Sequence, residues 1–400
     1  MKLLPKSQAS IYVLAACVVL LGAPARADVL RIALSMHQIQ AVFASEGGLL
    51  VRRAAQAHSA ALMPPELTPV VDVHALGGGL LLGGAVMAQT PVSIAPISDA
   101  PLMINGRPYR GSALVERDGP ATIRVLNAVE LEQYLYGVLP SEMTPGWPPA
   151  ALQAQAIVAR TYALAQAGTR ANSPFDLRAG EVDQAYNGMD AETPATSAAV
   201  DSTRDSVLTY EGQIVHAYYS ACDGGYTADG TELKDPQPYL AAAEDPYAAA
   251  SPHVHWMARI PLARLSAALK QRFGDSGRID SITAGPADAS GRVHAITLGG
   301  PGRARTLTAA LFRSLAGSHV VKSTRIQSLS LRGDAVEISG AGFGHGVGLS
   351  QWEARQMAES GISAQDILRF YYRGATLSKS SGVQAGAGAE NRYHHPVSRS

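Results

Sequence analysis

Alternating apolar and polar positions dominate the first third of the chain. In residues 28–36 the apolar side chains of Leu30, Ile32 and Leu34 occupy every second position, which is typical of a β-strand. Short apolar runs continue to residue 126, and Asn-Gly at 105–106 and Asp-Gly at 118–119 are strong hairpin signals. The pattern therefore predicts a long region of short strands and hairpins.

The hydrophobic period changes to that of a helix in residues 125–168. The spacing predicts a helix over residues 128–138 with Asn127 as its N-cap, and a second helix from Pro148-Pro149 to about Gly168. The two apolar faces are formed by Leu131, Tyr134, Leu135 and Val138, and by Leu152, Ala156, Ala159 and Ala163. Between the helices, residues 140–147 are expected to form a turn that carries one carboxylate, Glu142.

Helices and short strands alternate along the rest of the chain, so the predicted fold class is α+β. Helices are expected over residues 192–204, 262–273, 309–315 and 363–371, and hairpins over 206–219 and 326–340. Strands are expected at 279–283, 293–298 and 305–308, and a further helix follows residues 342–352 and ends near 360. We expect an N-terminal β-rich segment over 28–106, a main domain over 107–377 and a disordered tail over 378–400.

The first 27 residues have the pattern of a secretory signal peptide. Lys2 and Lys6 precede an apolar run over residues 11–22, and Ala25-Arg-Ala27 is a small-residue cleavage site. The alternative is a lipoprotein anchored through Cys17, at the end of Leu-Ala-Ala-Cys. The sequence thus predicts export, to the periplasm or the cell wall. Since 33 basic and 33 acidic residues cancel, the charge gives no indication of a nucleic-acid partner.

Glu142 is the first candidate for chemistry. A carboxyl group beside Trp147 and nearby tyrosines is partly desolvated, and desolvation raises its pKa toward the range that a general acid needs. Aromatic neighbours also suit stacking on sugar rings. The alternative is structural: Glu142 caps the helix that follows it.

Two further stretches carry candidate chemistry. His216 and Cys222 are suitable zinc ligands, but no tidy second pair completes four ligands, so a buried thiol and a hydrogen-bonded histidine remain the alternative. The stretch GFGHGVGLSQW has four glycines around His345, which permit close approach of the main chain to a ligand. The alternative is a tight strand-to-helix turn in which His345 fills space.

Four stretches together resemble the stage II sporulation protein D (SpoIID/LytB) family, which also contains an amidase enhancer. They lie, in the family's order, at residues 131–143 (LxxYLxGVxPxEM), 147–163 (WPxxALxAQAxxARTYA), 217–227 and 342–358. The resemblance spans roughly residues 107–377. It implies a fold of short strands and hairpins around a helical core that carries the catalytic turn.

The resemblance also implies a function. Sporulation members are lytic transglycosylases that cleave peptide-stripped peptidoglycan strands and leave 1,6-anhydro-N-acetylmuramic acid ends, with the glutamate at Glu142 as general acid and base. Other members are glycan-binding activators of a cell-wall amidase, which is the alternative, and neither activity implies a required cofactor. The groove is expected to contain Tyr134, Ser141, Trp147, Arg160, Tyr162, Ser220, Gly224, Gly225, His345, Gly346 and Gln351. Some members bind zinc in the region of His216 and Cys222 with a further cysteine, at whose position this chain has Ala228.

Overall fold

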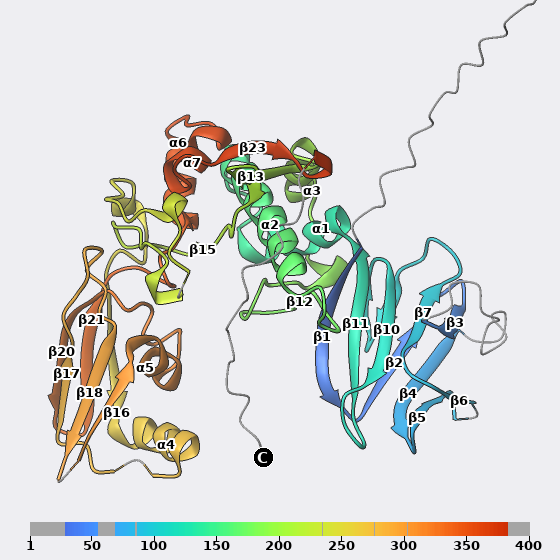
Figure 1. The fold of residues 1–400 in the computed structure, drawn as a ribbon, viewed down its shortest axis with the longest axis horizontal. Coiled ribbons are helices and arrows are strands. Elements are labelled where there is room, and N and C mark those ends of the chain that lie inside the picture. Colours follow the sequence, from blue (N-terminus) through green and yellow to red (C-terminus); the bar gives the residue numbers. More distant parts are fainter. Residues whose placement is uncertain are drawn as a thin grey trace, which may run out of the picture.

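Two β-rich regions lie on opposite sides of a helical region in the chain (Figure 1). The structure is a computed structural model, and it describes residues 29–54, 69–84, 86–233, 235–275, 277–301 and 303–382. The expected signal peptide and the lipid site at Cys17 lie outside the described residues. Helices and strands are mixed throughout, so the predicted α+β class is confirmed.

The N-terminal β region contains two six-stranded sheets. Their orders are β12-β1-β11-β10-β7-β3 and β6-β5-β4-β2-β8-β9. The strands are β1 (Val29–Gln38), β2 (Gln40–Ala44), β3 (Leu49–Arg53), β4 (Val70–Leu76), β5 (Gly79–Leu82), β6 (Val86–Ala88), β7 (Val92–Pro96), β8 (Leu102–Ile104), β9 (Arg107–Tyr109), β10 (Ser112–Arg117), β11 (Ile123–Glu130) and β12 (Leu177–Arg178).

Strand β1 shows why these residues form a sheet. Its alternation buries Leu30 and Ile32 and leaves Val29 exposed, as the period-two pattern predicts. It pairs with β11 antiparallel, and β8 and β9 form a hairpin across Asn105-Gly106. The expected segment boundary at residues 106 and 107 therefore falls inside this hairpin, and the sheets continue to Glu130.

The helical region holds the two helices that the apolar period predicted. Its helices are α1 (Leu131–Glu142), α2 (Pro149–Thr169), α3 (Pro194–Ser202), α6 (Gln351–Glu359) and α7 (Ala364–Tyr371). Its short 3-10 turns are η2 (Gly188–Ala191), η3 (Thr231–Leu233), η4 (Pro238–Leu240), η5 (Ala248–Ala250) and η6 (Ser380–Gly382). Its strands are β13 (Ser206–Tyr210), β14 (Gln213–Ile214), β15 (Tyr219–Ser220), β22 (Leu349–Ser350) and β23 (Thr376–Lys379).

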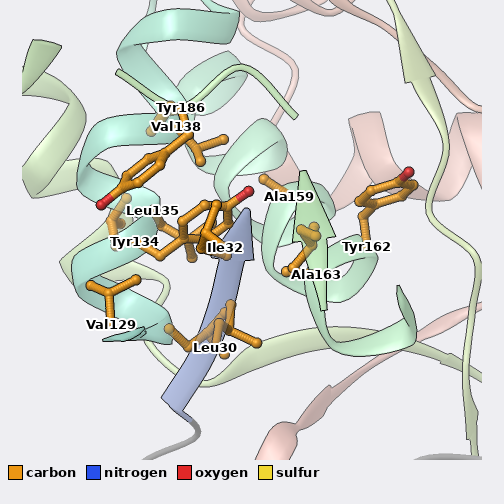
Figure 2. Close-up of a cluster of buried hydrophobic side chains, with 14 of the residues drawn as sticks. Leu30, Ile32, Val129, Tyr134, Leu135, Val138, Ala159, Tyr162, Ala163 and Tyr186 are labelled. Atoms are coloured by element: carbon orange, nitrogen blue, oxygen red, sulfur yellow. The ribbon is translucent and has the colours of Figure 1, made fainter. Parts of the chain in front are cut away.

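Helix α1 packs on strand β1, and helix α2 packs on α1. Figure 2 shows Leu30 and Ile32 of β1 beside Tyr134 and Leu135 of α1. The predicted apolar faces of both helices are buried in this core, which they share with the N-terminal sheets. The small side chains of α2, such as Ala159, allow the close packing that buries nearly the whole helix.

Two details of this pair differ from the prediction. Helix α1 does not end at Val138 but continues through Pro140 to Glu142, so Glu142 is the last residue of a helix rather than part of a turn. Proline removes only its own N–H bond, and the Met143 N–H still donates to the Leu139 carbonyl at 2.9 Å. Asn127 is not a cap, because strand β11 runs on through Glu130 before α1 begins.

The second β region has a hydrophobic core of its own. It comprises β16 (Trp256–Pro261), α4 (Leu262–Phe273), β17 (Ser281–Ala284), β18 (Ala295–Gly300), β19 (Arg303–Thr308), α5 (Ala309–Ala316), β20 (Ile326–Arg332) and β21 (Ala335–Gly340). Two three-stranded sheets, β16-β21-β20 and β17-β18-β19, bury a cluster that includes Trp256, Leu265 and Phe312. We call this region, residues 256–340, the inserted lobe, since the helical region continues on both sides of it in the sequence.

The end of the described chain corrects the expected tail. Thr376–Lys379 form β23, which pairs with β13, so the disordered tail does not begin at Ser378. Residues 383–400 lie outside the described residues. Among the helices that the structure describes, none is both long and apolar enough to cross a membrane.

Candidate active site

Glu142 lies at the carboxyl end of α1, half-buried among groups that donate hydrogen bonds. Its Oε1 accepts the backbone N–H of Ala185 at 2.7 Å, and the Tyr219 hydroxyl also donates to the carboxylate. Glu142 makes no cap for α2, whose first turn follows Pro148 without a side-chain cap. The structural alternative for this residue is therefore wrong.

The electrostatics of Glu142 suit proton transfer. Burial raises its pKa above the ordinary value, while the donors from Ala185, Tyr219 and Gln351 lower it and leave a net rise. The negative end of the α1 dipole acts in the same direction as burial. Gln351 is buried beside Glu142, and its Nε2 makes no other hydrogen bond of good geometry with the described residues.

The loop of residues 183–188 sets the position of the Ala185 donor. The Tyr186 ring rests on α1 at Gly137, where a Cβ would lie 2.7 Å from the ring and 2.8 Å from the Gly188 carbonyl. The Tyr186 hydroxyl donates to Asn127 Oδ1 at 2.8 Å. Asn127, expected as a helix cap, thus anchors the loop that supplies the Ala185 N–H.

Tyr219 is held from both sides of the site. Gln184 Nε2 donates to its hydroxyl at 3.3 Å and to the Ala159 carbonyl of α2 at the same distance. The Tyr134 hydroxyl donates to Gln184 Oε1 at 3.2 Å. Glu142, Tyr219, Gln184 and Tyr134 therefore form one hydrogen-bonded chain that fixes the carboxyl group.

The glycine-rich loop packs against β15, the strand formed by Tyr219 and Ser220. Gly342, Gly344, Gly346 and Gly348 all have positive φ, between 70° and 109°, a conformation that side-chain-bearing residues rarely adopt. The Gly346 N–H donates to Ser220 Oγ at 3.2 Å. The glycines allow β22 to pair with β15, which brings Gln351 to Glu142.

His345 stays neutral near physiological pH. Burial lowers its pKa to about 3, and the charges of Arg292 and Arg313 act in the same direction. Its Nδ1 accepts the Val347 N–H at 3.0 Å, and its ring lies edge-on to Tyr218. His345 therefore supports the loop as a neutral hydrogen-bonding group rather than as a cation.

Trp147 is partly exposed. It follows Glu142 on the connection between α1 and α2 and lies edge-on to Trp352, with ring centroids 5.0 Å apart. Ser141, beside Glu142, accepts from Asn187 Nδ2 at 2.9 Å. Of the expected groove residues, Gln351 lies beside Glu142, Ser141 precedes it in α1, and Trp147 contacts Trp352. Ser220, His345 and Gly346 form the neighbouring loop contact.

Three expected groove residues are buried supports instead. Tyr134 is fully buried behind Gln184, and Arg160 is fully buried in a two-bond ion pair with Glu132, at 2.7 and 2.8 Å. Tyr162 is 8% exposed, and its hydroxyl donates to Asp183. Long polar side chains in a motif are as consistent with buried pairing as with binding, and here pairing holds the helices together.

Among the described residues, Gly224 and Gly225 make their contacts with residues other than Glu142. Gly224 lies so close to Gly342 that a Cβ on Gly224 would be 2.6 Å from the Gly342 nitrogen. The Gly224 carbonyl accepts a hydrogen bond from the Arg325 guanidinium. The Gly225 N–H donates to Asp223 Oδ1 at 2.7 Å. Their positive φ values, 77° and 98°, serve a tight turn against the inserted lobe.

The residues at the expected zinc position do not fit a zinc site. His216 Nδ1 lies 2.5 Å from Asp235 Oδ2, whereas the Cys222 thiol donates to Glu353 Oε1 at 2.9 Å. Burial raises the pKa of Cys222, so the thiolate that zinc prefers is disfavoured. Within the described ranges no group of three or more His, Cys, Asp or Glu is arranged to hold a metal ion.

Sequence reasoning missed several residues of this site. Ala185 acts through its backbone, which leaves no side-chain signal. Tyr219 and Gln184 offered one, because Tyr219 lies in the stretch that resembles the family, directly before Ser220, and Gln184 lies in a polar loop between two helices. Only the fold shows that these loops meet at Glu142.

Comparisons with known proteins agree with the motif resemblance. The family described as "Stage II sporulation protein" matches residues 120–210, which contain α1, α2 and the loop that binds Glu142. The Stage II sporulation protein D of Bacillus subtilis is 27% identical over 271 residues, which cover 63% of this chain and 75% of that protein.

Two further relatives are similar over a comparable length. The Amidase enhancer of Bacillus subtilis is 30% identical over 293 residues, 61% of this chain but 40% of that protein. An uncharacterized protein of Brachyspira hyodysenteriae is 32% identical over 276 residues, 68% of this chain and 73% of its own length. The match to the amidase enhancer leaves most of that protein uncovered, so its activity does not transfer directly.

Proposed function

Because the chain belongs to the stage II sporulation protein D family, we propose that it acts on the cell wall as a lytic transglycosylase of peptidoglycan. The proposed substrate is a glycan strand without stem peptides. The proposed products end in 1,6-anhydro-N-acetylmuramic acid. The observation that carries the proposal is that Glu142 is only half-buried and yet has a raised pKa.

Glu142 would act twice in the proposed reaction. As the neutral acid it gives its proton to the glycosidic oxygen between N-acetylmuramic acid and N-acetylglucosamine, and the C1–oxygen bond breaks. As the resulting carboxylate it takes the proton of the muramic C6 hydroxyl, whose oxygen then bonds to C1. One carboxyl group is sufficient because the nucleophile belongs to the substrate, unlike the paired carboxyl groups of glycoside hydrolases.

The surroundings of Glu142 support both states of the group. Burial favours the neutral acid before proton transfer. The Ala185 N–H and the Tyr219 hydroxyl stabilise the carboxylate that follows. The proposed chemistry requires no metal ion or other cofactor.

The product mass tests the proposal. Wild type should release anhydro-muramyl fragments from peptide-free glycan strands, and Glu142→Gln and Glu142→Ala should release none that mass spectrometry detects. Hydrated reducing ends from the wild type would indicate hydrolysis instead. Equal product from wild type and both variants would rule out Glu142 as the catalytic residue.

A second candidate function follows from the similarity to the amidase enhancer. In this alternative the same groove binds glycan without turnover and activates a cell-wall N-acetylmuramoyl-L-alanine amidase. The wild type and Glu142→Gln would then stimulate an added amidase equally on intact peptidoglycan. Loss of stimulation in Glu142→Gln, together with anhydro products in the wild type, would reject this alternative.

We propose that the protein acts outside the cytoplasm, where both functions would find peptidoglycan. The signal-peptide pattern of residues 1–27 supports export to the periplasm or cell wall. The mass of the mature protein from the native host tests this proposal, with cleavage after Ala27 expected. A lipid on Cys17 would instead indicate a lipoprotein.

A further inference from the structure

A strip of aromatic rings joins the connection between α1 and α2 to the inserted lobe. We call it the aromatic strip, and its members are Trp147, Trp352, His253, Phe343 and His319. Successive ring centroids are 5.0 to 6.0 Å apart, and neighbouring rings meet edge to face. Each ring is therefore held in place by the next.

The strip is accessible along its length and joins separate parts of the fold. None of its five side chains is buried, and His319 is exposed. It begins at Trp147, on the connection between α1 and α2, and Trp352, in the first turn of α6. It ends at His319, which follows α5 of the inserted lobe.

Two cations lie on the strip. The Arg355 guanidinium lies 5.6 Å from the Trp147 ring centroid and 5.3 Å from that of Trp352, and its Nε donates to Glu359. Lys322 Nζ lies 5.8 Å from the centroid of the Phe343 ring. Arg355 is thus neutralised by a carboxylate of its own helix.

Lys322 differs from Arg355 in its partners. Its Nζ lies 3.3 Å from His253 Nδ1, and no ion pair joins it to a carboxylate among the described residues. Burial and the charge of Lys322 lower the pKa of His253, so this imidazole is a neutral acceptor. Among the described residues, the Lys322 ammonium group therefore has an imidazole and an aromatic ring as neighbours but no carboxylate partner.

The geometry points to a glycan-binding subsite along this strip, in which Lys322 binds a carboxylate carried by the sugar chain. The inference rests on the proposed function for the identity of the chain: a peptide-free strand carries one free carboxylate on each muramic residue. Aromatic rings provide surfaces for the apolar faces of sugars. The ammonium group provides the charge-assisted bond to the anion.

Charge decides between this ligand and two others. A neutral polysaccharide would gain nothing from an uncompensated ammonium group between rings. A polyphosphate would require a dense array of cations, whereas this strip offers one unpaired lysine on a chain with 33 basic and 33 acidic residues. A sugar chain with widely spaced carboxylates fits both observations.

Binding measurements on the full-length Glu142→Gln protein test the inference without turnover. The probes are peptide-free glycan strands, neutral N-acetylglucosamine oligomers and polyphosphate. Lys322→Met should weaken binding of the peptide-free strands about tenfold, the usual effect of losing a hydrogen bond to a charged group. The affinity for the neutral oligomers should change by no more than about twofold, since these oligomers carry no carboxylate to pair with the lysine. Phe343→Ala should weaken both about fivefold.

Two variants serve as controls. Lys270→Met removes an exposed lysine of α4 in the same lobe and should change neither affinity. Lys322→Arg retains the charge and should restore the preference for the carboxylate-bearing strands. Thermal melting confirms that each variant folds, because Lys322 is only half-buried.

The inference is overturned if Lys322→Met binds both glycans as the parent does, or if polyphosphate binds as tightly as the glycan strands. It is also overturned if Lys322→Met weakens both glycans equally. The experiments can reject the subsite and the proposed function independently of each other. Selective binding without anhydro products from the wild type would reject the transglycosylase alone, and anhydro products without selectivity would reject the subsite alone.

Discussion

Two of the glutamates that the structure describes, Glu142 and Glu353, have raised pKa values in different surroundings. Glu142 ends α1, where the helix dipole disfavours its charge, whereas Glu353 lies in the first turn of α6, where the dipole favours it. Burial is the largest cause of the rise in both pKa values. The dipole therefore does not decide either case.

The hydrogen-bond partners separate the two groups. Glu353 is fully buried and receives the Cys222 thiol and the Ser350 hydroxyl, close to the buried carboxyls of Asp223 and Asp245. Glu142 is half-buried and receives the Ala185 N–H. A raised pKa thus indicates an enclosed carboxyl, and only accessibility indicates a catalyst.

The largest expected contrast is in turnover. Glu142→Gln should lower the rate of anhydro-product formation by about 10²-fold or more, because general acid catalysis commonly contributes that much. The rate of Glu353→Gln should remain within about tenfold of the wild-type rate, since the buried carboxyl group at this position reaches no substrate. Initial rates on peptide-free strands measure both variants under the same conditions, and similar losses in both would break the comparison.

The second contrast is in how the free energy of unfolding depends on pH. Burial raises the pKa of Glu353 to about 7, so between pH 4.5 and 7 the folded state binds more protons than the unfolded state. The free energy of unfolding therefore falls as pH rises through this range, by about 3 kcal/mol from this group. The glutamine of Glu353→Gln does not titrate, so this variant should lose that part of the decrease in unfolding free energy with pH.

Urea unfolding at pH 5 and pH 8 measures this difference. The wild type should lose more stability than Glu353→Gln between the two values. Asp223 shares the network, and burial raises its pKa as well, so part of the slope should remain in the variant. An unchanged slope in Glu353→Gln would show that another group carries the titration.

Local periodicity predicted the elements of this fold better than it predicted their contacts. Helix α4 spans Leu262–Phe273, the predicted range, because its apolar spacing is a property of the segment alone. The end of α1 was misplaced because Pro140 stops most helices, yet it is accommodated in this last turn. The separate core of the inserted lobe gave no signal in the local pattern.

The candidate site was less predictable because it depends on long-range contacts. The bond from Ala185 to Glu142 joins residues 43 apart and involves a backbone group that any residue offers. Arg160 was assigned to the groove, but its partner Glu132, 28 residues away, makes it a buried support. Motif resemblance located Glu142, and the fold decided which residues surround it.

The smallest expected effect concerns Tyr219. Its hydroxyl donates to Glu142 and lowers the pKa of that carboxyl, so Tyr219→Phe should raise the pKa further. Activity that needs the neutral acid is lost as pH rises through this pKa, and the alkaline limb of the kcat/KM profile should therefore move to higher pH. The loss of kcat/KM at neutral pH should be about tenfold or less, because one hydrogen bond contributes about 1 kcal/mol.

Tyr218→Phe is the matched control, since the neighbouring hydroxyl donates to Asp235 at 2.9 Å instead of to Glu142. It should leave the alkaline limb where the wild type has it. A purely structural role for Tyr219 would lower the rate at every pH and leave the limb unmoved. A shift in Tyr219→Phe alone would assign the limb to Glu142, and equal shifts in both variants would assign it to another group.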